Sequence, residues 1–230
     1  MCRENRVPTP TRSEPQDPNE AARAARSEWR HRQLLDAAAR LMERDGFHGV
    51  SMQALAAEAE VSVGLIYRYF GGKDDLLLAV IVDVLDAFAA QVPPAVRAGT
   101  DPVERIAGAF RAYCEVINAH RHAAVLTYRE SKSLGTEGRA KIKRLEIETS
   151  EPLREALRAG VAGGLLTDVD VELVSQDFLL LAHGWALKRW YLGQTMDFEE
   201  YVVKQTALLL GAIVRTQHRD DYPHLLRPAG

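Results

Sequence analysis

Two short helical segments, each opened by a serine, constrain the fold of this chain more than any other sequence feature. Ser51 can cap the N-terminus of a helix over residues 52–59. Ser62 can cap another helix over residues 63–70, which ends at a Gly-Gly break. A longer helix precedes both. Two short helices joined by about three residues, behind a longer one, form a helix-turn-helix pattern.

The longer helix begins near Ala21, where apolar residues start to recur at three- and four-residue spacing. It ends at Gly46, which suits the left-handed C′ position. Residues 1–22 are rich in proline and polar residues without a helical period, so we expect a disordered tail there. The helix-turn-helix domain is therefore predicted to span residues 23–72.

The rest of the chain, residues 73–218, is predicted to form a second domain of about six longer helices. A capping box between Asp101 and Glu104 is expected to open one of them, and "DFEE" opens the last. Pro152 lies inside a long helix and should kink or split it. The predicted ranges are 73–91 (ending before Pro93-Pro94), 102 onward, 122–133, 136–162, 170–192 and 197–216, with a loose C-terminus at 219–230.

Composition favours an all-α protein. Aromatic residues make up only 7% of the 230 residues, alanine and leucine dominate, and long stretches carry no strand-like run of valine, isoleucine and threonine. The predicted fold class is all-α, with an N-terminal three-helix helix-turn-helix domain and a C-terminal helical bundle of about six helices.

The residue inventory argues against several kinds of site. Cys2 and Cys114 are the only cysteines, which excludes a disulfide framework or a four-cysteine zinc site. His120 and His122 would point about 200° apart on a helix, so we expect no metal and no cofactor. A Gly-rich phosphate loop, a G-x-S-x-G elbow and paired carboxylates are all missing, so we expect no enzyme.

The location predicted from the sequence is cytoplasmic. The first thirty residues hold charges and prolines where a signal peptide would have an apolar core. No run of about 18 apolar residues is present, so we expect no membrane partner.

Net charge gives no support to a non-specific nucleic-acid binder. The chain carries −3, and residues 21–75 balance eight basic against eight acidic side chains. If this segment binds DNA, its charges must be segregated onto separate faces of the helices.

The helix at 63–71 has two chemically distinct faces. At 100° per residue, Val63, Ile66 and Phe70 share an apolar face, while Gly64, Tyr67, Arg68 and Gly71 share the other. A helix of eight residues is about 12 Å long, and a major groove about 12 Å wide admits such an element. Gly64 would let the helix N-terminus approach base edges closely.

Lys73 opens the next helix, where a cation opposes the macrodipole at a cost of about 0.3–1 kcal/mol. The residue therefore needs another reason to be there. A DNA phosphate held jointly by Lys73 and the helix-terminal amides would provide one.

The stretch "SMQALAAEAEVSVGLIYRYFGGKDDLLLAVI" resembles the DNA-binding region of the tetracycline-repressor (TetR) family of bacterial regulators. The resemblance is specific over residues 29–80; beyond 85 only helix count and length agree. It implies a three-helix domain that reads a double-stranded DNA operator as a homodimer. It also implies a C-terminal domain that binds a small inducer and dimerises through its last two helices.

The resemblance also implies roles for individual residues. Ser51 and Gln53 would lie against backbone phosphates. Ser62, Val63, Gly64 and Tyr67 would lie nearest the bases, and Arg68, Tyr69 and Lys73 would contact phosphates. Glu60 stands where many relatives have glycine, so this residue is expected to be strained or the turn to differ. Tyr69 stands where relatives often have histidine.

The dimer interface is predicted on the last two long helices. Residues 171–192 leave little polar surface, and a helix that is apolar nearly all round is buried in a core or against a partner. The residues chosen for the interface are Leu181, Trp190, Leu209 and Ile213. The alternative is an intramolecular core alone.

The inducer site is predicted among the middle helices, in an apolar cavity with a few polar tips. Its expected lining is Phe110, Tyr113, Cys114, Ile117, Leu126, Tyr128, Phe178 and Trp185. Each of these could instead be plain core.

Residues 129–144 form the most basic window of the chain, with a charge of +4 that includes Arg129 and Lys132. With "HGWALKRWY" at 183–191, this window is similar to TetR-family branches that respond to acyl-coenzyme A thioesters. A basic rim could hold the nucleotide phosphates. A solvated basic helix face is the alternative.

The predicted function is a ligand-responsive DNA-binding regulator, a repressor that an inducer such as an acyl-CoA releases from its operator. The alternative is a helix-turn-helix protein that organises DNA or scaffolds a partner without any inducer.

Overall fold

The computed structural model describes residues 18–227, and within that range the protein is helical with no strands, which confirms the all-α prediction. One isolated antiparallel bridge joins Leu166 to Val214. The helices are α1 (Pro18–Asp45), α2 (Met52–Glu58), α3 (Val63–Tyr69), α4 (Lys73–Ala98), α5 (Pro102–Ala119), α6 (Arg121–Glu130), α7 (Thr136–Ala162), α8 (Val171–Leu187), α9 (Arg189–Leu192), α10 (Phe198–Ile213) and α11 (Pro223–Leu226), with 3₁₀ turns η1 (Ser131–Ser133) and η2 (Thr216–Asp221).

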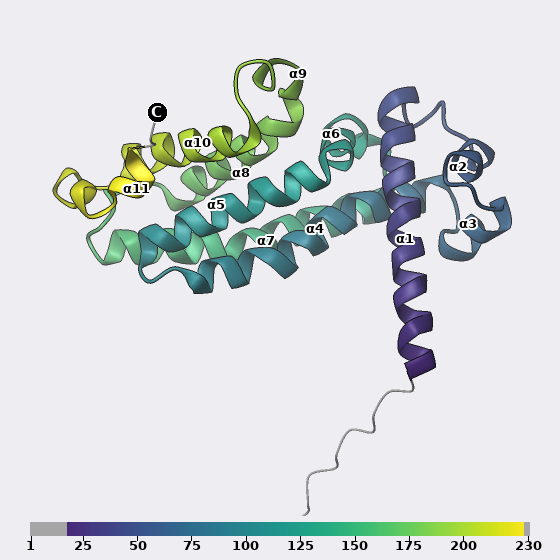
Figure 1. Ribbon diagram of the computed structural model, residues 1–230, viewed down its shortest axis with the longest axis horizontal. Coiled ribbons are helices and arrows are strands. Elements are labelled where there is room, and N and C mark those ends of the chain that lie inside the picture. The colour runs from purple at the N-terminus through teal and green to yellow at the C-terminus, as the bar shows by residue number, and fades with distance from the viewer. Residues whose placement is uncertain (1–17, 228–230) are drawn as a thin grey trace, which may run out of the picture.

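Figure 1 shows the helix-turn-helix unit at one end of the molecule and the chain's C-terminus at the other. The long helices α4, α5 and α7 run side by side along the long axis, with α8 and α10 stacked on them. Helix α1 crosses this axis, and α6 lies between α1 and the bundle. Helix α6 is therefore in direct contact with both parts of the molecule.

The two serine caps form as predicted. The Ser51 hydroxyl oxygen accepts a hydrogen bond from the Ala54 amide at 3.0 Å, and that of Ser62 accepts one from Leu65 at 3.2 Å. Each bond satisfies an amide that the helix start would otherwise leave unpaired.

Two residues in the turns of the helix-turn-helix unit adopt left-handed backbone. Gly46, after α1, has φ +75°, as its C′ position requires, and Glu60, between α2 and α3, has φ +53°. Glu60 is therefore strained, which is one of the two outcomes that the family resemblance implied, at a place where glycine would be relaxed.

Helix α1 starts at Pro18, so the predicted tail over 1–22 is wrong for residues 18–22; residues 1–17 lie outside the described part of the chain.

Helix α4 passes through Pro93 and Pro94 and ends at Ala98, so its predicted end at 91 is wrong. These prolines remove the hydrogen bonds to the carbonyls of Ala89 and Ala90, which are exposed and can be solvated. Val92 is fully buried, and its packing favours continuation of the helix.

Helix α7 likewise runs unbroken through Pro152, so the proline does not split it. Side chains satisfy carbonyls in the turn before it. The Tyr113 hydroxyl donates to the Thr149 carbonyl at 2.6 Å, and the Arg154 guanidinium donates to the Ile147 carbonyl at 2.7 Å. These donors stabilise the turn that the proline weakens.

The predicted helix at 170–192 is two helices, because α8 ends at Leu187 and Lys188 separates it from α9.

The C-terminal segment is ordered as far as residue 227, so the prediction of a loose end at 219–230 is wrong over 219–227. Tyr222 is buried and its hydroxyl donates to the Asp101 carboxylate at 3.1 Å. His224 lies 2.8 Å from the Glu104 carboxylate. Glu104 therefore pairs with His224 and does not close the expected capping box, whereas the box at Asp197 forms.

Helix α4 is long and apolar enough, by length and composition, to cross a membrane. The sequence has no unbroken run of 18 apolar residues here, because Asp83 and Asp86 interrupt it. In the fold, α4 packs against α1, α5 and α7 and buries eight apolar residues, as the core helix of a bundle does.

Candidate nucleic-acid interface and ligand groove

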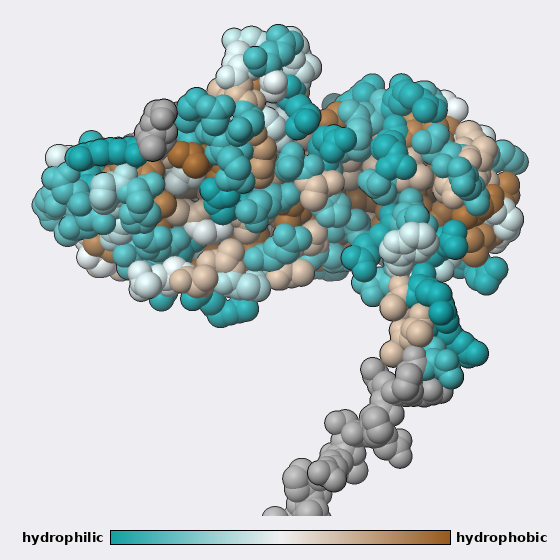
Figure 2. Space-filling view, viewed as in Figure 1, coloured by the Kyte–Doolittle hydropathy of each residue, from teal (hydrophilic) through white to brown (hydrophobic). Residues whose placement is uncertain are grey.

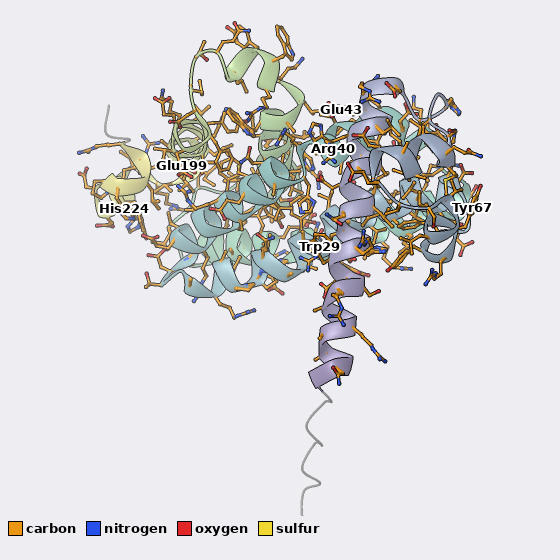
Figure 3. The ribbon with its side chains drawn as sticks, turned by 45° about the vertical axis from the view of Figure 1, so that its right-hand side comes forward. Trp29, Arg40, Glu43, Tyr67, Glu199 and His224 are labelled. Carbon is orange, nitrogen blue, oxygen red and sulfur yellow. The ribbon has the colours of Figure 1, made fainter. Side chains whose placement is uncertain are left out.

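The outward face of α3 is as predicted. Ile66 has no exposed surface and Phe70 only 4%, while Tyr67 is 53% exposed and Arg68 is exposed. Figure 3 shows Tyr67 on the outer side of the helix-turn-helix unit, away from the bundle. Neither Tyr67 nor Arg68 has a hydrogen-bond or ion-pair partner within residues 18–227. Both side chains are available to another molecule.

Gly64 lies on the same face, and a Cβ built there would meet nothing within 4 Å. The protein itself therefore does not require glycine at this position. A ligand that approaches the backbone closely at this position would require glycine there.

Lys73 is already engaged within the protein. Its ammonium donates to the carbonyls of His48 at 3.2 Å and Val50 at 3.1 Å, and it lies 4.7 Å from the centre of the Phe47 ring. These contacts hold the α1–α2 loop against the start of α4 and explain a cation at this helix N-terminus. The ammonium has three N–H donors, so its phosphate contact stays a prediction.

Tyr69 is half-buried and also has an internal partner. Its hydroxyl oxygen lies 3.1 Å from the Ser27 hydroxyl, and its ring packs against His31 of α1. Gln53 is exposed at the start of α2, and Val63 is half-buried.

A groove of about 560 Å³ opens between α4, α6, α7 and α8. That size lies within the range of about 300–1,000 Å³ typical of small-molecule sites. Its lining combines apolar residues with hydroxyl, amide, imidazole and charged groups. The lining residues are Leu85, Phe88, Thr127, Tyr128, Ser131, Arg139, Ile142, Lys143, Glu146, Ile147, Thr149, Gln176, Leu179, Leu180 and His183.

Most of the residues predicted to line the inducer site lie elsewhere, and Tyr128 alone of the ten lines this groove. Seven are core residues with at most 2% exposure: Phe110, Tyr113, Cys114, Ile117, Leu126, Phe178 and Trp185. Arg129 donates to the Glu43 carbonyl at 3.1 Å, and Lys132 is exposed outside the groove. Spacing shows which residues are apolar and not which helix faces a void, so an inducer-binding role for these residues stays a prediction.

The basic window did indicate part of the site, since Arg139 and Lys143 line the groove. Arg139 donates to the backbone carbonyl of Leu134, whereas Lys143 has no hydrogen-bond or ion-pair partner within the described chain. His183 and Glu146 were missed. Burial lowers the pKa of His183 and raises the pKa of Glu146, so the groove holds the imidazole neutral.

Helix α6 joins the groove to the DNA-binding unit. His122 contacts the Glu43 carboxylate of α1, and Arg129 contacts the same residue's backbone, as described above. Glu43 faces the bundle in Figure 3. Tyr128, next to Arg129, lines the groove. Helix α6 therefore touches both the ligand groove and α1.

The described residues contain no group of three or more His, Cys, Asp or Glu side chains that could hold a metal ion. Cys114 is a free, buried cysteine, and burial raises the pKa of its thiol.

Apolar side chains are exposed on α8 and α10. Leu173 and Leu180 of α8 and Leu208 of α10 are all more than half exposed, as is Trp190 of α9. Leu181 and Leu209 are half-buried, and Ile213 is buried, so Ile213 is wrong as an interface residue. Helix α10 packs its Leu210 and Ile213 side chains into the core, while Leu208 points to solvent.

Hydrophilic residues cover most of the face seen in Figure 2, and its apolar areas are scattered among them. Scattered apolar residues of this kind are usual on a protein surface. Leu173 and Leu208 are exposed on α8 and α10, two helices in contact with each other, and exposed leucines on adjoining helices indicate a contact surface.

Comparisons with known proteins agree with this geometry. The family described as "Bacterial regulatory proteins, tetR family" matches residues 34–80, and "Tetracyclin repressor-like, C-terminal domain" matches residues 99–210. The chain is similar to the HTH-type transcriptional regulator HbdR of Aromatoleum sp. (strain CIB), at 39% identity over 80% of each chain. It is also similar to the HTH-type transcriptional repressor KstR2 of Mycolicibacterium smegmatis, at 29% identity over 82% of this chain and 92% of that one.

Two solved structures share the fold. The TetR family regulator PfmR of Thermus thermophilus has a TM-score of 0.70 at 28% identity, covering 77% of this chain and 97% of its own. AibR in complex with isovaleryl coenzyme A and operator DNA has a TM-score of 0.65 at 26% identity, covering 75% and 94%.

Proposed function

This chain belongs to the TetR family of bacterial DNA-binding transcription regulators, and we propose that it is a cytoplasmic repressor that binds its operator as a homodimer and is released by a small molecule in the groove. The observation that carries the proposal is the outward face of α3. Tyr67 and Arg68 are exposed there without partners in the described chain, beside a glycine that the fold does not need.

The proposed contacts with DNA follow from this face. Ser62, Val63, Gly64 and Tyr67 lie nearest the bases. Arg68 reaches a phosphate, as do Ser51, Gln53, Tyr69 and the remaining donor of Lys73. Phosphate contacts fix position and base contacts give sequence preference.

Leu173 of α8 and Leu208 of α10, both more than half exposed, support a homodimer through these helices, and Leu181, Trp190 and Leu209 would belong to the same interface. Two α3 helices would then read half-sites about 34–36 Å apart, one turn of the duplex. Light scattering on the full chain measures this directly, and a monomer that still binds the operator contradicts it.

The groove supports a small-molecule inducer and an acyl-CoA in particular. Its apolar floor suits an acyl chain, and Arg139 and Lys143 at its rim suit phosphates. AibR, which shares the fold, was solved with isovaleryl coenzyme A. The alternative, a DNA-organising protein without an inducer, is disfavoured because the bundle contains a groove of ligand size.

The experiment that tests the function selects an operator from the host's genomic DNA and measures binding by fluorescence anisotropy across a salt series. Arg68→Ala should weaken binding to all sequences and reduce the salt slope by about 1, whereas Tyr67→Ala should change the preferred sequence. Arg227→Ala, an exposed arginine at the far end, is the matched control. A salt-independent affinity, or an Arg68→Ala variant that binds like the parent, contradicts the proposal.

Adding acyl-CoA thioesters to the same complex tests release. An inducer should lower the anisotropy and also stabilise the free protein by RT ln(1 + [L]/Kd), which thermal unfolding detects.

A further inference from the structure

His183 lies in the groove with one ring nitrogen uncommitted. Its Nδ1 lies 2.7 Å from the Leu179 carbonyl oxygen, which can only accept, so Nδ1 carries the proton and donates it. In the neutral ring Nε2 then carries the lone pair. Nε2 has no hydrogen-bond partner within residues 18–227. The groove therefore presents a fixed hydrogen-bond acceptor.

The position of the imidazole is set by its neighbours. The ring lies edge-on to two aromatic rings, with its centre 6.2 Å from that of Phe88 on α4 and 5.5 Å from that of Tyr128 on α6. The hydrogen bond from Nδ1 to the Leu179 carbonyl fixes the rotation of the ring between them. An acceptor held by two rings and a backbone bond is ordered before a ligand arrives, so little ordering entropy is lost on binding.

Two other polar groups of the groove are also free of hydrogen bonds. The Tyr128 hydroxyl makes none in the described chain, and the Glu146 carboxylate of α7 makes neither a hydrogen bond nor an ion pair there. The basic groups, Arg139 and Lys143, both belong to α7. The α7 side of the groove thus carries two basic groups and the Glu146 carboxylate, while α8 supplies a neutral acceptor whose ring lies between Phe88 of α4 and Tyr128 of α6.

Building on the proposed function, we propose that His183 determines which acyl group the groove accepts, by accepting a hydrogen bond at Nε2 from a hydroxyl on the acyl part of the inducer. The phosphates of the thioester lie toward Arg139 and Lys143, which leaves the acyl part to reach the imidazole. A plain alkyl chain in that place strips water from Nε2 and gives it no partner. A site built to bind a hydroxyl rejects the analogue that lacks it.

The test compares matched thioesters on the full chain by isothermal titration: butyryl-CoA with 3-hydroxybutyryl-CoA, and hexanoyl-CoA with 3-hydroxyhexanoyl-CoA. Of the two pairs, the one whose chain length fits better should show the effect. In that pair the parent protein should bind the hydroxyacyl-CoA about 10- to 100-fold more tightly than the plain acyl-CoA. His183→Phe keeps an aromatic ring between Phe88 and Tyr128 but has no acceptor, so this preference should disappear. His183→Gln keeps an acceptor and should retain part of it.

His224→Phe is the control, since this exposed histidine pairs with Glu104 at the other end of the molecule. It should leave the preference unchanged. If His183→Phe does not fold, His183→Gln and the preference of the parent protein still decide the outcome.

Equal affinity of the parent for both members of each pair overturns the proposal for His183 while leaving an acyl-CoA regulator intact. So does a preference that survives in His183→Phe. Failure of every thioester to bind a protein that still binds its operator overturns both the inference and the acyl-CoA part of the proposed function.

Discussion

The outward face of α3 and the groove of the bundle both present uncommitted side chains, yet the sequence indicated the whole of the first and only a small part of the second. Helix α3 is short and two-sided, with Ile66 and Phe70 buried, so its other face must point outward. Helix α5 carries four of the residues predicted for the inducer site but lines no part of the groove; it buries ten residues and is apolar over much of its circumference. A binding face can therefore be predicted from the sequence where a helix has a single apolar side. It cannot be predicted where several sides of the helix are apolar.

The same contrast appears within the DNA-binding unit. The exposure of Tyr67 follows from periodicity alone. The contacts of Lys73 do not, since His48 and Val50 lie more than twenty positions earlier in the chain. Local pattern gives the direction of a side chain and not its partner.

The largest expected effect separates core from surface aromatics. Phe110→Ala should reduce the free energy of unfolding by about 3–5 kcal/mol, because it leaves a cavity in a fully buried core. Tyr67→Ala, at an exposed site, should change it by less than about 0.5 kcal/mol. Urea unfolding at one protein concentration measures both. Similar losses in the two variants would break the contrast between the regions.

An intermediate effect is expected at Lys73. Lys73→Met keeps the apolar stem against Phe47 but removes two charge-assisted hydrogen bonds, so unfolding should become easier by about 1–3 kcal/mol without any DNA present. Lys132→Met, at an exposed lysine outside the groove, is the matched control. Unchanged stability in Lys73→Met would assign this lysine to DNA alone.

The smallest expected effect lies at the junction between the two regions. Burial raises the pKa of Asp83, which lies 3.4 Å from His120, and the nearby histidine charge only partly opposes this. With the folded pKa above the unfolded one, the ionised carboxylate destabilises the fold above the folded pKa. Asp83→Asn should therefore raise stability at neutral pH by at most about 1 kcal/mol, after allowance for solvent screening.

The difference between Asp83→Asn and the parent should shrink as the pH falls through the raised pKa, where the parent carboxyl becomes neutral too. Thermal unfolding between about pH 7 and pH 4 measures it. Lower stability of Asp83→Asn than of the parent at neutral pH would mean that the pair with His120 outweighs burial.

The sequence by itself determined the helical class, the two serine caps, the left-handed Gly46, and the outward direction of Tyr67 and Arg68. Each of these depends on residues within one helical turn of one another. The tertiary structure alone decided that α4 and α7 continue through their prolines, that residues 219–227 pack on the start of α5, and that His183 faces a groove. In those cases the residues that decide the outcome come from distant parts of the chain. The apolar pattern of a helix does not show which other helix, or which cavity, lies opposite it.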